Sequence, residues 1–317
     1  MDFSALKSKI IGPDFPVVTP FKDDYSVDAD GIKRYLDFLY AGGARIFHVM
    51  IHTSRFGLLL PEEMQKVNAI VACHVKENFK DCIVIAANPI YGPTYLSQEF
   101  AKHARDNGAD VLGVYFCERY YNEHQVYNFF ETIANSCDIG ILIHEQQLAT
   151  IHGSKLMLFP EQLLNRLADI DNIIAIKEDA KEDDYTYKIV NLLQDRINII
   201  VSGGSKEQFM KFGPLGSQAY LVGVASFWPE LAVKFYEDYL RGDTSACWKI
   251  INEIEQPFFQ VSKRLGWHIG LKAAMSHLGL MGITERPPLC ELKNDEYDEV
   301  AAVTEKIMTR GHDLKLR

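Results

Sequence analysis

Short apolar runs alternate with amphipathic segments along most of the chain. The runs are dominated by Val, Ile, Leu, Phe or Tyr and show little polar alternation, which is typical of strands buried on both faces of a parallel sheet. This pattern predicts eight strands, at Phe15–Thr19, Arg45–Ile51, Asp81–Ala87, Asp110–Phe116, Ile139–His144, Asn172–Lys177, Ile197–Ser202 and Ala219–Val224.

The segments between these runs have the apolar spacing of helices. Asp28–Ala41 ends at Gly42-Gly43, a common C-terminal signal. Similar patterns cover Ser97–Asn107, Glu123–Ser136, Pro160–Ala168, Asp184–Leu193, Ser205–Phe212 and Trp228–Arg241. Strands that alternate with helices over residues 15–241 predict a (β/α)₈ barrel of the α/β class, which needs about 250 residues. A doubly wound sheet is the alternative, but it usually has a Gly-rich turn where this chain has Pro20-Phe21-Lys22.

The C-terminal part has helical patterns with no strand between them. They cover Ala246–Leu265, Gly270–Leu278 and Asp295–Met308. We therefore expect a barrel over residues 1–242 and helices over residues 243–317 that pack on it as one structural unit.

The composition is that of a soluble globular protein. Hydrophobic residues make up 47% of the 317 residues, and 33 Lys plus Arg against 43 Asp plus Glu give a net charge of −10 with no basic run, which argues against nucleic-acid binding. No apolar stretch reaches the roughly 20 residues of a bilayer span, and the N-terminus lacks the apolar core of a signal peptide. The six cysteines form no C-x-x-C pair, so we expect reduced thiols and a cytoplasmic location.

Candidate chemistry lies at the C-terminal ends of the predicted strands, where such barrels build their active sites. Lys177 follows Ile173, Ile174, Ala175 and Ile176, so its side chain begins in apolar surroundings. Loss of hydration favours the neutral form of an amine, and a neutral amine can attack a carbonyl to form a Schiff base. The alternative is a structural lysine that reaches water or pairs with Glu178 or Asp179.

The segment Asn172-Ile-Ile-Ala-Ile-Lys177-Glu178 resembles the Schiff-base lysine segment of the dihydrodipicolinate synthase / N-acetylneuraminate lyase family. Further similar segments, in order, are Val17-Val-Thr-Pro-Phe21 with Val27-Asp28, Gly108-Ala-Asp110, Gln125-Val-Tyr127-Asn-Phe-Phe130, Ser202-Gly203-Gly204, and Leu271-Lys272-Ala-Ala with Leu278-Gly279. The resemblance runs from about residue 12 to 291.

The resemblance implies a (β/α)₈ barrel that binds pyruvate or another 2-oxo acid as an imine on Lys177. Family members make or break a C–C bond, or dehydrate a sugar acid, without a metal or organic cofactor, and the resemblance implies a homotetramer or dimer. The substrate-binding residues that it implies are Thr53, Ser54, Arg55, Tyr121, Ser202, Gly203 and Val222. Tyr120 or Tyr121 corresponds to a tyrosine that reaches the neighbouring subunit's site.

The chain departs from the family at the proton relay. Ile51-His52-Thr53-Ser54-Arg55 replaces a Gly-Thr-Thr-Gly-Glu motif, and His144-Glu145 replaces Tyr-Asn. An imidazole can donate and accept a proton near neutral pH. We hypothesise that His52 and His144 replace the hydroxyl relay, with His144 nearest the imine. The alternative is an inactive homologue that acts as a 2-oxo-acid binding or sensor protein.

Other positions also differ from the family. Ser226 stands where an Asn is typical, and the stretch Gln146–Leu158 is longer than usual, so we expect an altered pocket. If Arg55 faces that pocket, its guanidinium can clamp a second carboxylate of the substrate; the alternative is a surface ion pair.

The sequence also contains residues typical of a metal site and of a phosphate-binding turn. His48, His52, His144, Glu145 and His152 include metal-ligand residue types, but they lack a His-Glu-x-x-His helix. The turn Ser202-Gly203-Gly204-Ser205-Lys206 lies where barrels often bind phosphate, although a Gly-Gly turn also serves backbone conformation alone. We expect neither a metal nor a cofactor.

Overall fold

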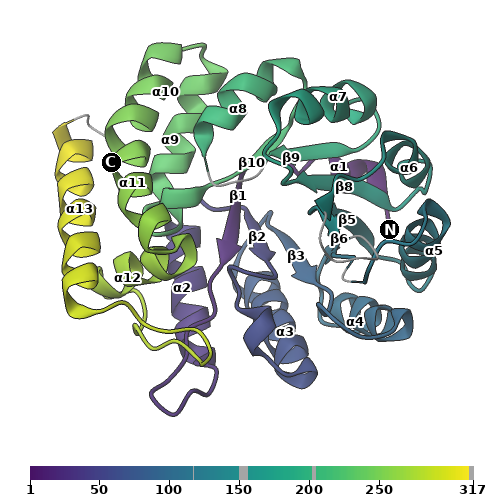
Figure 1. The fold of residues 1–317 in the computed structure, drawn as a ribbon, viewed down its shortest axis with the longest axis horizontal. Coiled ribbons are helices and arrows are strands. Elements are labelled where there is room, and N and C mark those ends of the chain that lie inside the picture. Colours follow the sequence, from purple (N-terminus) through teal and green to yellow (C-terminus); the bar gives the residue numbers. More distant parts are fainter. Residues whose placement is uncertain (117, 150–155, 202–204, 314–317) are drawn as a thin grey trace.

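The computed structural model describes residues 1–116, 118–149, 156–201 and 205–313. Eight parallel strands close into a barrel in the spatial order β1-β10-β9-β8-β5-β4-β3-β2. They span β1 Gly12–Val17, β2 Ile46–Val49, β3 Ile83–Ala87, β4 Val111–Val114, β5 Gly140–His144, β8 Ile173–Glu178, β9 Asn198–Val201 and β10 Ala219–Leu221. The predicted (β/α)₈ barrel is confirmed, with the strands at the centre of Figure 1.

Helices surround the strands. They are α2 Ala29–Ala41, α3 Pro61–Asn78, α4 Thr94–Asp106, α5 Glu123–Ala134, α6 Glu161–Leu167, α7 Asp183–Leu193, α8 Lys206–Phe212 and α9 Pro229–Leu240. Neither α3 nor the short helix α1 Phe3–Lys7 is among the helices predicted from the sequence. Leu6 of α1 and the nearby Ile10 pack against the apolar layer inside the barrel, so α1 closes its N-terminal end.

Most strand boundaries differ from the predictions by one to three residues, and the start of the first strand and the end of the last differ most. The first strand begins at Gly12 rather than at Phe15. The last strand ends at Leu221 rather than at Val224, because the chain turns into the 3-10 segment η3 Gly223–Ser226, where Gly223 has a φ of +57° that no strand adopts. The expected strand end at Ser202 lies outside the described residues.

Side chains inside the barrel form layers. Ile46, Ile83, Val111, Ile174 and Ala219 belong to one apolar cluster in the interior. A separate and larger cluster fills the space between the strands and the helices. Because apolar residues fill the N-terminal part of the interior, polar chemistry is confined to the C-terminal end of the barrel.

The C-terminal region is helical, as predicted. It comprises α10 Thr244–Ile250, the π-helical turn η4 Ile251–Glu255, α11 Gln256–Leu265, α12 Trp267–His277 and α13 Asn294–Asp313. The ring centroids of Phe227, just before α9, and Phe258 of α11 lie 5.1 Å apart. The helix α13 lies along the outer side of α11 and α12 (Figure 1).

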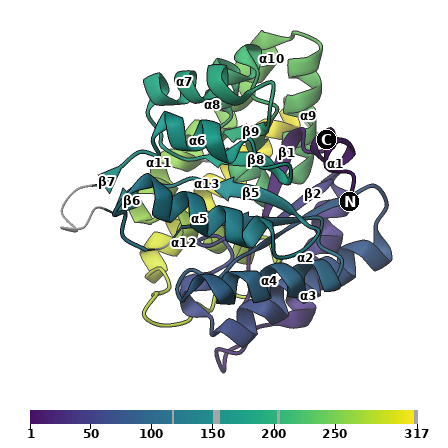
Figure 2. The ribbon, with the colours of Figure 1, turned by 90° about the vertical axis from the view of Figure 1, so that its right-hand side faces the viewer.

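The long segment after β5 contains a small hairpin. β6 Leu148–Ala149 pairs antiparallel with β7 Leu156–Met157, and residues 150–155 lie outside the described chain. The hairpin and α1 lie on opposite sides of the molecule (Figure 2). Since α1 closes the N-terminal end of the barrel, the hairpin belongs to the end where the strands terminate.

Candidate active site

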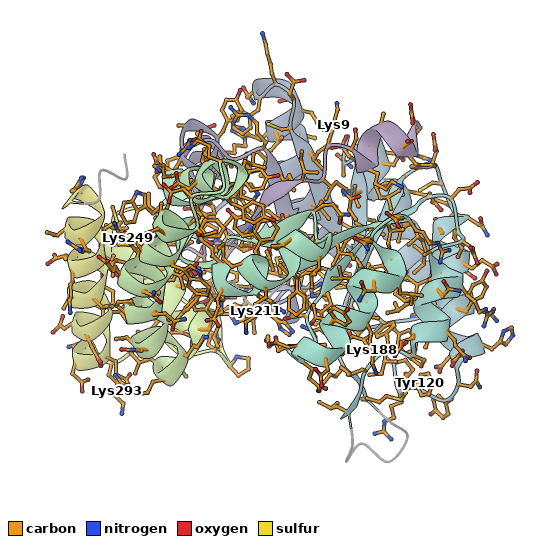
Figure 3. All side chains as sticks on the ribbon, turned by 90° about the horizontal axis from the view of Figure 1, so that it is seen from above. Lys9, Tyr120, Lys188, Lys211, Lys249 and Lys293 are labelled. Atoms are coloured by element: carbon orange, nitrogen blue, oxygen red, sulfur yellow. The ribbon has the colours of Figure 1, made fainter. Side chains whose placement is uncertain are left out.

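A cavity of about 640 Å³ opens at the C-terminal ends of the strands. Its floor and walls come from β1, β2, β5, β8 and β10 and from the C-terminal helices. The lining includes Pro16, Met50, His52, Thr53, His144, Gln146, Lys177, Asp179, Leu221, Gly223, Ser226, Lys263, Trp267, His268 and Leu271. Lys181, Asp183, Glu207 and Lys211 contribute charged groups to the same cavity. Figure 3 shows Lys211 near the middle of the view and Tyr120 toward its edge.

Lys177 lies at the centre of this arrangement. Its side chain is 1% exposed, and its Nζ lies 3.1 Å from Nε2 of His144 and 2.9 Å from Oδ2 of Asp179. His144 and Lys177 are register partners on β5 and β8, so the two side chains leave neighbouring strands side by side. Asp179 is two residues beyond Lys177 and therefore faces the same side of the strand. The amine is thus held between a carboxylate and an imidazole.

Three histidines approach the cavity, and burial lowers the pKa of each. The pKa of His144 is well below 6.5 because the ring is buried and lies near the Lys177 ammonium. Burial also lowers the pKa of His52. The pKa of His268 is lowered to about 3, mainly by burial and further by the nearby Arg55 charge. These three rings are therefore neutral at neutral pH. A neutral His144 presents a lone pair at Nε2, which accepts an N–H from Lys177.

Two buried carboxyls behind the strands fix the segment that follows Lys177. Glu145 Oε2 accepts the backbone N–H of Asp179 at 3.1 Å, and Glu178 Oε1 accepts that of Ala180 at 2.8 Å. Thr186 donates its hydroxyl to the other oxygen of Glu178. Burial raises the pKa of Glu145 to about 8 and also raises that of Glu178. Both therefore support the position of Asp179 from outside the barrel.

The structure brings some of the predicted site residues together and leaves others apart. His52, Thr53, His144 and Lys177 line the cavity. Ser54 lies inside the fold, where its hydroxyl accepts Met50 N–H at 2.8 Å and donates to the Val17 carbonyl. Outside the lining are also Val222, whose carbonyl accepts Lys206 Nζ, and Tyr121, which is 55% exposed. Ser202 and Gly203 lie outside the described residues.

Arg55 does not face the cavity, contrary to the hypothesis of a carboxylate clamp, and it is not a surface residue either. It is 3% exposed and forms a bidentate pair with buried Glu285. Its Nη1 and Nη2 donate to the carbonyls of Thr53 and His268 at 3.1 and 3.0 Å. Because its donors are used within the protein, Arg55 connects the loop after β2 to α12 instead of binding substrate.

Sequence reasoning missed four residues of the lining that bear on its chemistry: Asp179, Gln146, Trp267 and His268. The alternation of strand side chains could have found Asp179, since it follows Lys177 by two positions. Gln146 Oε1 lies 3.5 Å from His52 Nε2, and the His52 and His268 rings lie 6.0 Å apart. His268 and Trp267 come from α12, and no local pattern connects that helix to the strand ends.

The described residues contain no cluster of three or more His, Cys, Asp or Glu side chains suited to a metal ion. Two of the residues that the sequence offered as metal ligands are His48 and His152. His48 Nδ1 lies 2.7 Å from Asp14 Oδ2, and His152 lies outside the described chain. Within the same described part, no helix has the length and apolar character to cross a membrane.

The chain matches the model of the dihydrodipicolinate synthetase family over residues 9–307. It is 27% identical to 4-hydroxy-tetrahydrodipicolinate synthase of Methanothrix thermoacetophila, an alignment that covers 95% of this chain and 97% of the relative. It is 26% identical to a probable 5-dehydro-4-deoxyglucarate dehydratase of Allorhizobium ampelinum, with coverage of 92% and 93%.

Crystal structures have the same fold. Dihydrodipicolinate synthase of Bacillus clausii superimposes with a TM-score of 0.83 at 22% identity, covering 95% of this chain and 98% of that one. N-acetylneuraminate lyase of Mycoplasma synoviae superimposes with a TM-score of 0.81 at 19% identity, with the same coverage. At these identities the structures establish the barrel and no more.

Proposed function

Because the chain belongs to the dihydrodipicolinate synthetase family, we propose that it is a lyase or dehydratase that holds pyruvate or another 2-oxo acid as an imine on Lys177. The observation that carries this proposal is the Lys177 amine inside the cavity, between His144 and Asp179. Relatives named as a synthase and as probable dehydratases support this class of chemistry.

Imine formation requires a proton acceptor beside the amine. The Lys177 ammonium gives up a proton to His144 Nε2 or to the Asp179 carboxylate, both of which lie within hydrogen-bond distance. The free amine then attacks the ketone carbon of the acid, and the carbonyl oxygen gains a proton to become a hydroxyl. That hydroxyl accepts a second proton from the relay and leaves as water, so the nitrogen is bound to carbon by a double bond and carries one proton.

His144 then serves the carbon chemistry. The protonated imine draws electrons from C3 of the acid, so a proton at C3 can pass to Nε2 of neutral His144 and leave an enamine. The enamine can add to an aldehyde, or the reverse sequence can cleave a C–C bond. Loss of a hydroxyl from a sugar acid follows the same proton path. His144 thus transfers the protons that we assign to side-chain hydroxyls in other members of the family.

Thr53 and His52 are proposed to receive the carboxylate of the acid. Both line the cavity on the β2 side. The Arg55 guanidinium holds the Thr53 carbonyl from behind, so this turn is fixed before substrate enters. In this proposal His52 contacts the carboxylate and also shares the proton relay expected from the sequence, and His144 is the member of the relay nearest the imine.

Borohydride reduction tests the proposal. The protein is incubated with pyruvate and with a series of other 2-oxo acids, reduced, and weighed by intact mass spectrometry. The expected gain is one molecule of acid minus one oxygen atom, and Lys177→Met should prevent it. Absence of any gain with every acid would refute the imine. A gain without turnover of any aldehyde partner or sugar acid would instead identify a binding or sensor protein.

We also propose that the protein is a cytoplasmic homo-oligomer, a tetramer or dimer, as the family resemblance implies. The exposed Tyr121 side chain and the neighbouring Tyr120 are the residues proposed to approach a partner subunit. Sedimentation analysis of the wild-type protein and of Tyr121→Ala would test both the assembly and the part of this tyrosine in it.

A further inference from the structure

The wall that the C-terminal helices contribute to the cavity contains a lysine that the proposed imine chemistry does not use. Lys263 lies on α11 and lines the cavity together with Trp267, the first residue of α12. The Lys263 ammonium nitrogen lies over the ring of Phe259, 4.4 Å from the ring centroid. Trp267 packs edge-on against the same ring, with 5.1 Å between the two centroids. The ammonium group therefore has a defined place at the aromatic edge of the cavity.

Lys263 differs from the other cations of the lining in its partners. Each of the other three lysines has a carboxylate within 3.5 Å, in the pairs Lys177–Asp179, Lys181–Asp179, Lys211–Asp183 and Lys211–Glu207. Within the described part of the chain, Lys263 forms no such pair, and its ammonium group contacts the Phe259 ring instead. Its N–H donors are thus left for a ligand or for water.

The described part of the lining has an excess of positive charge. It contains four lysines and three carboxylates. Burial lowers the pKa of each of its three histidines, so these add no charge at neutral pH. The chain as a whole carries a net charge of −10. A positive site on an acidic protein favours anionic ligands over cationic ones.

The cavity has room for a ligand that extends beyond the reacting centre. In the proposed function, the carboxylate of the 2-oxo acid lies on the β2 side, at Thr53 and His52, and the ketone carbon next to it is joined to Lys177. Lys263 belongs to α11, a different part of the wall. A volume of about 640 Å³ is enough to enclose a ligand much larger than pyruvate. A longer substrate that is held at Lys177 can therefore bring its far end to α11.

We propose that Lys263 recognises a second anionic group, and that the substrate is a 2-oxo acid with a carboxylate or phosphate at the end remote from its ketone. The inference rests on the proposed function, which places the 2-oxo acid end on Lys177. The ammonium group can donate hydrogen bonds to the remote anion while it stays over the Phe259 ring. Lys263 thus determines specificity and takes no part in proton transfer. It has the role hypothesised from the sequence for Arg55, whose donors are used inside the protein.

Three variants test this role. Lys263→Met removes the charge and keeps an apolar stem, whereas Lys263→Arg keeps the charge and should retain recognition, because a guanidinium also binds carboxylate and phosphate. Lys249→Met is the matched control, since Lys249 is likewise an exposed lysine, on α10, and does not line the cavity. Figure 3 shows Lys249 well apart from Lys211 of the lining. Because Lys263 is exposed, all three proteins should melt at the wild-type temperature.

The first measurement compares acids that differ only in the remote group. 2-Oxoglutarate and 2-oxopentanoate have chains of equal length, and 4-phosphono-2-oxobutanoate carries a phosphonate in place of the second carboxylate. 2-Oxoadipate and 2-oxohexanoate repeat the comparison with a longer chain. The initial rate of borohydride trapping over a series of concentrations gives the half-saturating concentration and the maximal rate for each acid. The wild type should be half-saturated at a lower concentration of an anionic acid than of its apolar counterpart. Comparison of the diacid with the phosphonate then identifies the anion.

We expect Lys263→Met to raise the half-saturating concentration of the preferred anionic acid about 10-fold, as for a charged hydrogen bond at a partly hydrated site. Its maximal rate should not change, nor should either constant for the apolar acids. Lys263→Arg and Lys249→Met should resemble the wild type. Added salt should weaken binding of the anionic acid to the wild type and have little effect on Lys263→Met. Equal half-saturating concentrations for anionic and apolar acids in the wild type, or an unchanged preference in Lys263→Met, would overturn the inference.

A second measurement does not depend on the imine. Glutarate, 4-phosphonobutanoate and pentanoate have no ketone, and calorimetry measures their binding to the wild type and to Lys263→Met. One of the two dianions should bind the wild type about 10-fold more tightly than the variant, and pentanoate should not distinguish the two proteins. Absence of trapping with every 2-oxo acid would refute the imine, whereas binding of a dianion that depends on Lys263 would still establish the anion site. Equal binding to both proteins, or no binding of either dianion, would overturn the anion site.

Discussion

Lys177 and His144 are register partners on adjacent strands, and their side-chain nitrogens lie 3.1 Å apart in the floor of the cavity. A parallel ladder fixes the relative height of its residues, so this contact is set by the barrel itself and not by a mobile loop. Asp179, on the same side of the chain, completes the surroundings of the amine at 2.9 Å. The groups to which we assign the chemistry are thus organised before any substrate binds.

The first prediction concerns His144. Its replacement by Phe removes the proton acceptor nearest the amine, and a positioned acid/base group contributes about 10² to 10⁴ in rate. We expect His144→Phe to slow, by this factor, the exchange of the pyruvate methyl protons with deuterated water, which NMR follows. Prolonged borohydride reduction should still label Lys177. A variant that exchanges and turns over at the wild-type rate would rule out His144 as the relay. His103→Phe, on α4 and outside the cavity, is the matched control.

The second prediction concerns the pH at which exchange is lost. Burial and the nearby Lys177 charge hold the pKa of His144 well below 6.5, so the ring stays neutral and able to accept a proton in mildly acidic solution. We expect the acidic limb of the exchange rate to have its midpoint well below pH 6.5. A midpoint at or above pH 6.5 would mean that His144 is solvated like a free histidine and would contradict the geometry.

The third prediction concerns Arg55, whose guanidinium pairs with Glu285 in the interior. Arg55→Ala leaves Glu285 with Lys272 as its remaining cationic partner, at 3.3 Å. Lys272 then compensates only part of the desolvation cost of the Glu285 carboxylate, so we expect a loss of about 3 kcal/mol in the free energy of unfolding. Chemical denaturation measures this loss.

Two comparisons sharpen this result. Arg264→Ala breaks a pair with Glu299 whose side chains are 57% and 45% exposed, and it should cost less than about 1 kcal/mol. Joint replacement of Arg55 and Glu285 by apolar residues should be milder than Arg55→Ala alone. If Arg55→Ala left stability intact but changed which 2-oxo acids are trapped, the clamp hypothesis would return.

The fourth prediction is a pH dependence of stability due to Glu145. Burial raises its pKa in the folded protein to about 8, from an ordinary value of 4.5. The folded state therefore holds a proton that the unfolded chain has already released, and the free energy of unfolding falls as pH rises from about 4.5 to 8. The loss is on the order of a few kcal/mol and is complete above pH 8.

Glu145→Gln should remove this part of the slope, because an amide imitates the protonated acid. Denaturation at pH 6 and pH 8.5 gives the slope for both proteins. Glu178 has a raised pKa as well, so a smaller slope should remain in the variant. Parallel slopes in wild type and Glu145→Gln would show that Glu145 is ionised in the folded protein.

Much of the fold follows from local pattern. The eight apolar runs lie where the eight strands form, because strands buried on both faces require unbroken apolar sequence. The rule that active sites lie at the C-terminal strand ends led directly to Lys177, His144, His52 and Thr53, all of which line the cavity. Strand boundaries were less accurate, since a turn such as that at Gly223 is decided by backbone conformation.

The remaining site residues depend on contacts between distant parts of the chain. Arg55 and Glu285 are separated by 230 positions, and nothing near Arg55 in the sequence reveals its partner. His268 and Trp267 reach the cavity only because α12 packs over the strand ends. Asp14 and His48 lie on different strands, and their contact depends on the pairing of β1 with β2.

Peptide mapping of the borohydride-reduced pyruvate adduct tests the central claim most directly. The account predicts a single modified lysine, Lys177, and an unmodified Lys177→Ala protein, whose fold is checked by its melting temperature because the side chain that it loses is buried. Lys206, which is equally buried but pairs with Glu255 and lies outside the cavity lining, should carry no adduct. An adduct on any other lysine, or one that persists in Lys177→Ala, would contradict the account.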